Sequence, residues 1–122
     1  MKRPLKEGLT QVVEKNRMRF HMPGHKGRQD FLLPLQWDFT EIPETDDLHN
    51  PTGILQESQI CAARVFGAKD TYYLVNGATG GLEAALLAVL APGDRVVVPR
   101  NAHQSIHYGI EFAGAGPVYL MP

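Results

Sequence analysis

An alternation of apolar runs and helical patterns in the second half of the chain constrains the fold most strongly. The apolar runs are TYYLV (71–75), RVVVP (95–99) and PVYLM (117–121), and helical patterns separate them, one from the turn NGATGG to about Leu90 and one over about 103–113. Apolar strands that are joined by helical crossovers are typical of a parallel sheet covered on both faces. The order β-α-β-α-β therefore predicts an α/β fold.

This predicted sheet is small. Three parallel strands with two or three covering helices would leave one edge, and a face as well, open to solvent. We therefore expect residues 20–122 to form the front part of a larger α/β domain, incomplete as a domain, or one that completes itself by association. A chain of 122 residues otherwise has the length of one domain with a modest core.

The first half of the chain is predicted to hold two helices around a long irregular segment. Apolar residues at i, i+4, i+7 and i+8 (Leu5, Leu9, Val12 and Val13) indicate an amphipathic helix over 5–16, with Pro4 near its start. Residues 20–50 are rich in Pro, Gly and Asp and show no sustained period. A second helix is predicted from Pro51, in its first turn, to Phe66, with Gly67 as its stop.

Composition excludes several classes of protein. With 43% hydrophobic residues, 20% charged residues and a formal net charge of −1, the chain is typical of an ordinary globular protein. The basic N-terminal stretch, residues 1–28, indicates docking on an acidic surface rather than binding of nucleic acid, because the whole chain is not basic. A single cysteine, Cys61, excludes an internal disulfide. Because no apolar stretch is long enough for a signal peptide or a membrane span, we expect a cytoplasmic protein.

The turn NGATGG is the first candidate binding feature. In open α/β sheets, ligands bind beyond the carboxyl ends of the strands, at the N-termini of the helices that follow. Gly77 lets the backbone approach a ligand, the N–H groups of Ala78 and Thr79 would point at it, and the Thr79 hydroxyl is usable as an N-cap or as a phosphate donor. A phosphate fits this chemistry, although the turn matches neither GxGxxG nor the P-loop.

A second polar turn, PRNAHQS, follows the next predicted strand. Its His103 would offer a flat, titratable ring at the mouth of the same cleft, and Ser105 could cap the following helix or reach the phosphate. A phosphate turn and an aromatic ring on neighbouring strand ends predict a phosphorylated planar ligand. The i, i+4 spacing of His103 and His107, and of His21 and His25, is also compatible with a metal site. The first pair needs a third ligand and lacks the glutamate of HExxH, and the second contains Pro23 and Gly24, so helical spacing does not apply and no metal site is predicted.

Four segments in order resemble the Orn/Lys/Arg decarboxylases: FHMPGHKG, TEIPETDDLHNPTG, FGAKDTYYLVNGATGG and PGDRVVVPRNAHQS. The resemblance runs from about residue 20 to the end of the chain. It implies a pyridoxal-phosphate enzyme of the aspartate-aminotransferase fold type (fold type I), whose large domain opens with a β-α-β-α-β segment. It further implies that Gly77, Ala78 and Thr79 form the cofactor-phosphate loop, that His103 stacks on the pyridine ring and has a possible auxiliary catalytic role, and that Ser105 adds a polar contact.

The same resemblance makes HMPGHKG, with His25 and Lys26, a lining of the active-site entrance, commonly in a dimer whose partner subunit completes the site. Asp46 and Asp47 have two readings. They either recognise the amine of a basic amino-acid substrate or belong to a polar loop in which Asn50 or Thr52 caps a helix. The family also includes long members with an extra N-terminal wing domain. Because only about 19 residues precede FHMPGHKG, this chain resembles the short form, and we expect residues 1–19 to form a helical arm that serves dimerisation.

One part of the family's machinery does not occur in this chain. The resemblance implies a lysine in a Ser-x-His-Lys motif that binds the cofactor covalently, and no such motif is present, since Lys26 stands in a different context. The chain would therefore hold the cofactor phosphate without carrying out decarboxylation by itself. The interpretations are the N-terminal part of a lysine, arginine or ornithine decarboxylase that yields a polyamine-pathway amine, or a non-catalytic binding or regulatory subunit.

Overall fold

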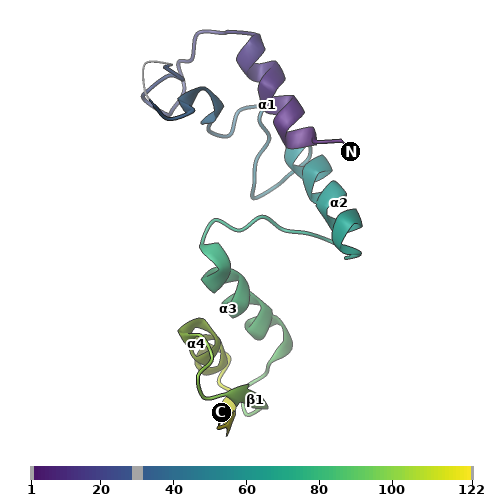
Figure 1. Ribbon diagram of the computed structural model, residues 1–122, viewed down its shortest axis with the longest axis vertical. Helices are drawn as coiled ribbons and strands as arrows, with labels where there is room; N and C mark the ends of the chain where they lie inside the picture. The colour runs from purple at the N-terminus through teal and green to yellow at the C-terminus, as the bar shows by residue number, and fades with distance from the viewer. Residues whose placement is uncertain (1, 29–31, 122) are drawn as a thin grey trace. The chain divides into compact units, whose positions relative to one another are not determined.

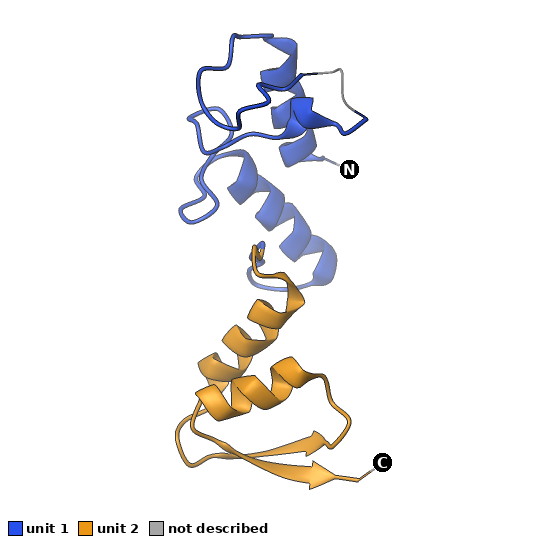
Figure 2. Cartoon of the chain, turned by 90° about the vertical axis from the view of Figure 1, so that its left-hand side faces the viewer, with its two compact units in different colours: residues 1–73 blue, residues 74–122 orange. Residues whose placement is uncertain are grey.

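The computed structural model describes residues 2–28 and 32–121 and divides the chain into two compact units, residues 1–73 and 74–122 (Figures 1 and 2). Unit 1 holds the helices α1 (Pro4–Glu14) and α2 (Ile54–Phe66) and the short 3-10 helix η1 (Leu35–Trp37). Unit 2 holds α3 (Gly77–Val89), β1 (Arg95–Pro99), α4 (Gln104–Phe112) and β2 (Gly116–Leu120).

The two predicted helices of unit 1 are confirmed, with one correction. Helix α1 has Pro at its first position, and its predecessor Arg3 donates its N–H to Glu7 Oε1 at 3.0 Å. Helix α2 ends at Gly67, whose φ of 64° is the left-handed conformation that glycine adopts readily. It does not begin at Pro51, however. It begins at Ile54, because a carboxylate from the preceding loop receives the N–H groups just ahead of it.

Helices α1 and α2 pack against each other at Gly8. A Cβ at Gly8 would lie 2.6 Å from Ile54 Cγ2, so the close approach depends on the missing side chain. The apolar stripe of α1 (Leu5, Leu9, Val12 and Val13) is half-buried within this unit. Helix α2 therefore covers part of the apolar stripe of α1, for which the sequence identified no partner surface.

Unit 2 confirms the α/β class. Strands β1 and β2 are parallel, in a register that pairs Val97 with Val118, and α4 connects them. Figure 2 shows that α3 and α4 lie on the same side of the two strands. The core is small: among the described residues of this unit, the buried hydrophobic ones are Val98, Ile110 and Ala113.

One predicted strand is wrong. Residues 71–75 carry no strand, and Tyr72, Leu74 and Val75 are exposed. A strand is stable only when its backbone groups pair with a neighbour, and in the part of the chain that the structure describes β1 and β2 pair only with each other. An apolar run is thus not sufficient for a strand where no neighbouring strand lies beside it.

Apolar surface remains uncovered in unit 2, as expected for an incomplete α/β domain. In β1, Val97 is 64% exposed, whereas the next residue, Val98, is 3% exposed. Because adjacent residues of a strand point to opposite faces of the sheet, one face is covered and the other is exposed. Helix α3 also leaves Leu82, Leu87 and Val89 exposed, a pattern that normally belongs to a helix buried on several sides. Within the described ranges, no helix has the length and apolar character needed to cross a membrane.

Candidate functional site

The start of α3 presents backbone donors to the outside. Its N-cap is Asn76, whose side chain makes no capping hydrogen bond, and Gly77 has a φ of +65° that favours glycine. The first N–H that bonds along the helix is that of Gly80, to the Asn76 carbonyl at 3.4 Å. Within the described residues, the N–H groups of Gly77, Ala78 and Thr79 have no partner, and all three residues are exposed.

The structure corrects the local picture of this turn. NGATGG is not a loop before a helix, because the helix already begins at Gly77. Thr79 therefore lies in the first turn and is not the N-cap, a position that Asn76 occupies. The free N–H groups and the positive end of the helix dipole together form an arrangement that suits an anion. A Cβ at Gly77 would meet nothing within 4 Å, so the positive φ and not crowding is what favours glycine at this position.

His103 and Ser105 lie together at the start of α4. His103 is the N-cap, and its Nδ1 accepts the Ser105 N–H at 3.3 Å and lies 2.8 Å from Ser105 Oγ. His103 is exposed, whereas Ser105 is 1% exposed. The predicted helix cap at this turn is thus provided by the histidine, and the serine hydroxyl is directed at the histidine ring.

Both candidate turns belong to unit 2. Figure 2 shows that α3 and α4 each begin on the side toward which β1 and β2 point, as the sequence pattern predicted for a parallel sheet. The Gly77–Thr79 donors and His103 thus stand at the starts of two helices of the same unit. The remaining candidates, His25, Lys26, Asp46 and Asp47, belong to unit 1.

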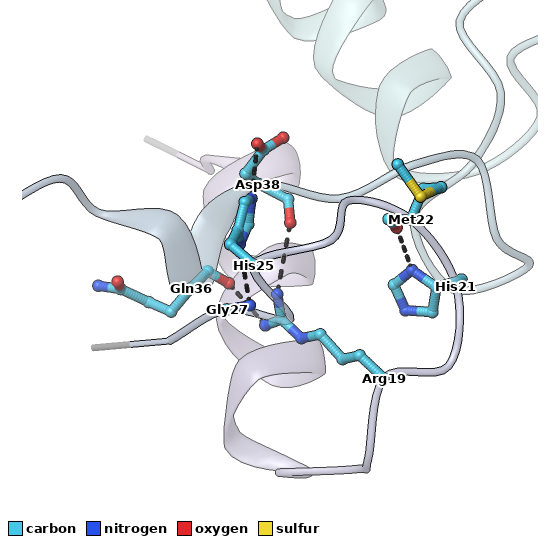
Figure 3. A network of polar contacts seen from close by, with 7 residues as sticks. All are labelled: Arg19, His21, Met22, His25, Gly27, Gln36 and Asp38. Carbon is cyan, nitrogen blue, oxygen red and sulfur yellow. Dashed lines mark hydrogen bonds and ion pairs between the residues drawn. The ribbon is translucent and has the colours of Figure 1, made fainter. Parts of the chain in front are cut away.

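In unit 1, the HMPGHKG segment is folded onto residues 36–39 by a polar network (Figure 3). His25 Nε2 lies 3.0 Å from Asp38 Oδ2, and its Nδ1 accepts the Gly27 N–H at 3.0 Å. Because Nδ1 accepts an N–H, the ring proton lies on Nε2 and is donated to Asp38. Both nitrogens of His25 are therefore occupied within the loop.

Arg19 secures the same segment from the other side. Its guanidinium donates to the Gln36 carbonyl at 2.7 Å and to the Asp38 carbonyl at 3.3 Å, and it lies over the Phe39 ring at 3.9 Å from the centroid. The sequence reasoning missed both Arg19 and Asp38 as members of this network. No periodicity marks them, and only the contacts of the folded loop identify them.

Lys26 is turned back into its own loop. It has a φ of 55°, and its Nζ donates to the His21 carbonyl at 2.6 Å. The ammonium group is exposed, so it remains accessible from solvent while it holds the loop.

Asp46 receives backbone donors with both carboxylate oxygens. Oδ1 accepts the N–H groups of Asp47 and Thr52 at 3.0 and 2.9 Å, and Oδ2 accepts those of Gly53 and Leu55 at 2.8 and 3.0 Å. Desolvation raises the pKa of Asp46, but these four hydrogen bonds outweigh it and lower the pKa to about 2. Asp46, rather than Asn50 or Thr52, thus caps the start of α2.

Asp47 is less engaged than its neighbour. Its Oδ1 accepts the His49 N–H at 2.8 Å, and within the described residues its Oδ2 accepts no hydrogen bond. As to metals, no group of three or more His, Cys, Asp or Glu side chains in the described residues lies close enough to hold an ion. Of the two carboxylates proposed from sequence, only Asp47 keeps an oxygen available for a ligand.

Comparison with known proteins places this arrangement in a family. Residues 3–122 match the family model described as "Orn/Lys/Arg decarboxylase, major domain". Arginine decarboxylase of Halalkalibacterium halodurans is 38% identical over 128 residues, which cover 98% of this chain and 26% of that protein. Ornithine decarboxylase of Haemophilus influenzae is 37% identical over 133 residues, covering 96% of this chain and 18% of that protein.

Solved structures agree with the sequence comparison. Lysine decarboxylase A from Pseudomonas aeruginosa superposes with a TM-score of 0.79 at 29% sequence identity, over 98% of this chain and 18% of that one. The chain thus spans between 18% and 26% of the length of these relatives. The family description covers nearly every residue, and the parallel strands with their covering helices fit it. The chain belongs to the Orn/Lys/Arg decarboxylase family.

Proposed function

We propose that this chain supplies the cofactor-phosphate and ring-stacking side of a pyridoxal-phosphate-dependent decarboxylase of a basic amino acid. The relatives are named arginine, ornithine and lysine decarboxylases, which supports a substrate with a cationic side chain. When bound, pyridoxal 5'-phosphate supplies the electron sink for cleavage of the carboxylate carbon bond. The residues of this chain bind, orient and shield that group.

The start of α3 is the observation that carries the proposal. A phosphate dianion needs several N–H donors and a positive dipole, and Gly77, Ala78 and Thr79 offer three unpartnered N–H groups at a helix N-terminus. The exposed Thr79 side chain adds a hydroxyl in the same turn. The exposed His103 ring, at the start of the other helix of the unit, is suited to lie on the face of a planar pyridine.

The substrate side of the proposal rests on unit 1. Asp47 is the better candidate for binding the substrate ammonium, because Asp46 uses both of its oxygens to hold backbone N–H groups. His25 and Lys26 belong to the folded HMPGHKG segment, which we assign to the entrance of the site. We further propose that the protein works as a homodimer in the cytoplasm, with the α1 arm contributing to the subunit contact.

The direct test uses the protein expressed from its own gene. Its intact mass is measured before and after borohydride reduction, and carbon dioxide release is measured with lysine, arginine and ornithine in turn. We expect a chain heavier than 13.5 kDa that carries a reduced pyridoxal-phosphate adduct and releases carbon dioxide from one of the three amino acids. A 13.5 kDa chain without adduct or activity would overturn the proposal in favour of a binding or regulatory subunit.

The substrate assignment is tested separately. Asp47→Asn should raise the KM of the active enzyme by about tenfold or more with little change in protein stability, because it removes one charge-assisted hydrogen bond. Glu41→Gln is the matched control, since Glu41 is an exposed carboxylate of the same unit. An unchanged KM in Asp47→Asn would remove this residue from the site.

A further inference from the structure

Ser105 is placed where it can act on His103 and not on a ligand. It is 1% exposed, and its hydroxyl lies 2.8 Å from His103 Nδ1. Its backbone N–H donates to the same nitrogen at 3.3 Å. The histidine, in contrast, is exposed. A side chain that is buried behind an exposed ring and bonded to it acts on whatever the ring contacts, through the ring.

These contacts also determine the protonation pattern of the ring. A nitrogen that accepts a backbone N–H has its lone pair directed at that N–H and carries no proton. The neutral His103 ring therefore has its proton on Nε2, which is the nitrogen turned away from Ser105. The Ser105 hydroxyl, 2.8 Å from Nδ1, can rotate to share this lone pair with the backbone N–H, and either donor favours the same tautomer.

We propose that Ser105 is a positioning residue that holds the plane and the tautomer of His103. The functional part of this inference rests on the proposed function, in which the His103 ring stacks on the cofactor. It replaces the direct cofactor contact that the sequence suggested for Ser105. A fixed ring costs less conformational entropy when the pyridine stacks on it, because it is ordered before the ligand arrives.

The first test examines the ring itself and needs no cofactor. The protein expressed from its own gene is labelled with ¹⁵N-histidine, and the His103 signals are assigned by their loss in His103→Ala. We expect Nδ1 to show the chemical shift of an unprotonated, hydrogen-bonded nitrogen, and Ser105→Ala to displace that signal. Ser58→Ala is the matched control, because the Ser58 hydroxyl contacts Tyr73 Oη at 2.5 Å in the other unit. A Nδ1 signal that Ser105→Ala leaves unmoved would overturn the proposal.

The second test is a double-mutant cycle on cofactor binding. Loss of one hydrogen bond should weaken the Kd for pyridoxal 5'-phosphate about fivefold in Ser105→Ala. In the His103→Ala background the same substitution should change the Kd by less than about twofold, because a positioning residue has nothing left to position. An equal loss in both backgrounds would contradict the proposal, since it would indicate packing or direct contact.

The two tests separate the inference from the proposed function. If the wild-type protein does not bind pyridoxal 5'-phosphate while Ser105→Ala still displaces the Nδ1 signal, the proposed function fails and the positioning of His103 by Ser105 stands. If the cofactor binds but neither the Nδ1 signal nor the Kd responds to Ser105→Ala, the function stands and the positioning role is refuted.

Discussion

Different interactions stabilise the interior of each of the two units. In unit 1 an irregular segment is ordered by side chains that bond to backbone groups, chiefly Arg19, His25 and Asp46. In unit 2 helices and a parallel ladder satisfy the backbone, and apolar faces such as that of Val97 remain bare. Where regular elements are missing, polar side chains must satisfy the backbone. Where they are present, the shortage is in apolar cover.

The units share one device, a glycine at the contact of two helices. Gly8 lets α1 approach Ile54 in α2, and Gly109 lets α4 approach Leu86 and Glu83 in α3. Gly8 is half-buried, whereas Gly109 is buried. The same contact is therefore at an edge in unit 1 and at the centre of unit 2, and this difference ranks the effects of substitution.

The largest effect is expected at the centre of unit 2. In Gly109→Val the new Cβ would lie 2.6 Å from Leu86 Cδ1 and 3.2 Å from Leu86 Cβ, so Leu86 must change its rotamer or the two helices must move apart. We expect a loss of about 3 kcal/mol in the free energy of unfolding, measured by urea denaturation. Gly8→Val, at the edge of its contact, should cost less. Equal losses would show that burial does not distinguish the two contacts.

Next in size is the loss of a side chain that orders the loop of unit 1. Arg19→Ala removes two hydrogen bonds to carbonyls and a cation–π contact, and we expect a loss of about 2 kcal/mol. Arg17→Ala is the matched control, because its ion pair with Glu44 at 3.1 Å is exposed and should contribute less than about 1 kcal/mol. Urea denaturation of both variants measures the difference. Similar losses would argue against an ordering role for Arg19.

A smaller effect with a distinct pH dependence is expected at Asp46. Asp46→Ala removes the acceptor of four backbone N–H groups and should cost about 1 to 2 kcal/mol at pH 7. The folded state lowers the pKa of Asp46 from 3.8 to about 2, so its contribution is complete above pH 3.8 and is lost as the pH falls toward 2.

The check on Asp46 is a series of denaturation curves between pH 7 and pH 2. The difference between the wild-type protein and Asp46→Ala should shrink over the lower part of that range. Asp47→Ala, which loses a single backbone hydrogen bond, should show a smaller difference at pH 7. A difference for Asp46→Ala that is independent of pH would exclude the ionised carboxylate as its source.

The smallest effect is expected on the bare face of the sheet. Val97→Ala in the 122-residue chain should change the free energy of unfolding by less than about 0.5 kcal/mol, because Val97 is 64% exposed. Its neighbour Val98, which is 3% exposed, provides the comparison, and Val98→Ala should cost about 2 kcal/mol. A large effect at Val97 would indicate that this face is covered, for example by association of two chains.

Local pattern was sufficient for much of the fold. The helices and the strands at 95–99 and 116–120 follow from periodicity and from punctuation by Pro and Gly, and these signals act within a few residues. The run 71–75 has an equally apolar sequence but no strand, because strand formation depends on a neighbour that the sequence pattern does not name. The prediction of a strand at 71–75 was therefore wrong because no strand pairs with this segment, and not because its residues have a low strand propensity.

The features of the candidate site also fall into those that the sequence predicts and those that only the structure shows. The turn at Gly77 and the histidine at position 103 follow from their place after apolar runs and before helices, together with a resemblance of motifs. That Asp46 is a cap with both oxygens occupied, and that Ser105 is buried behind His103, was not accessible from the sequence. The Asp46 cap depends on the direction of a backbone segment seven residues away, and the burial of Ser105 depends on the packing of α4 in the folded unit.

The sequence by itself determined the family, the α/β class and the positions of four helices and two strands among the described residues. These depend on local spacing and on motifs that are read in order. The tertiary structure alone decided which carboxylate keeps an oxygen available, which ring nitrogen carries the proton and how Arg19 bonds to residues 36 and 38. Each of these is a contact between groups whose distance is set by the folded backbone, and hydrogen bonds form only over that short range.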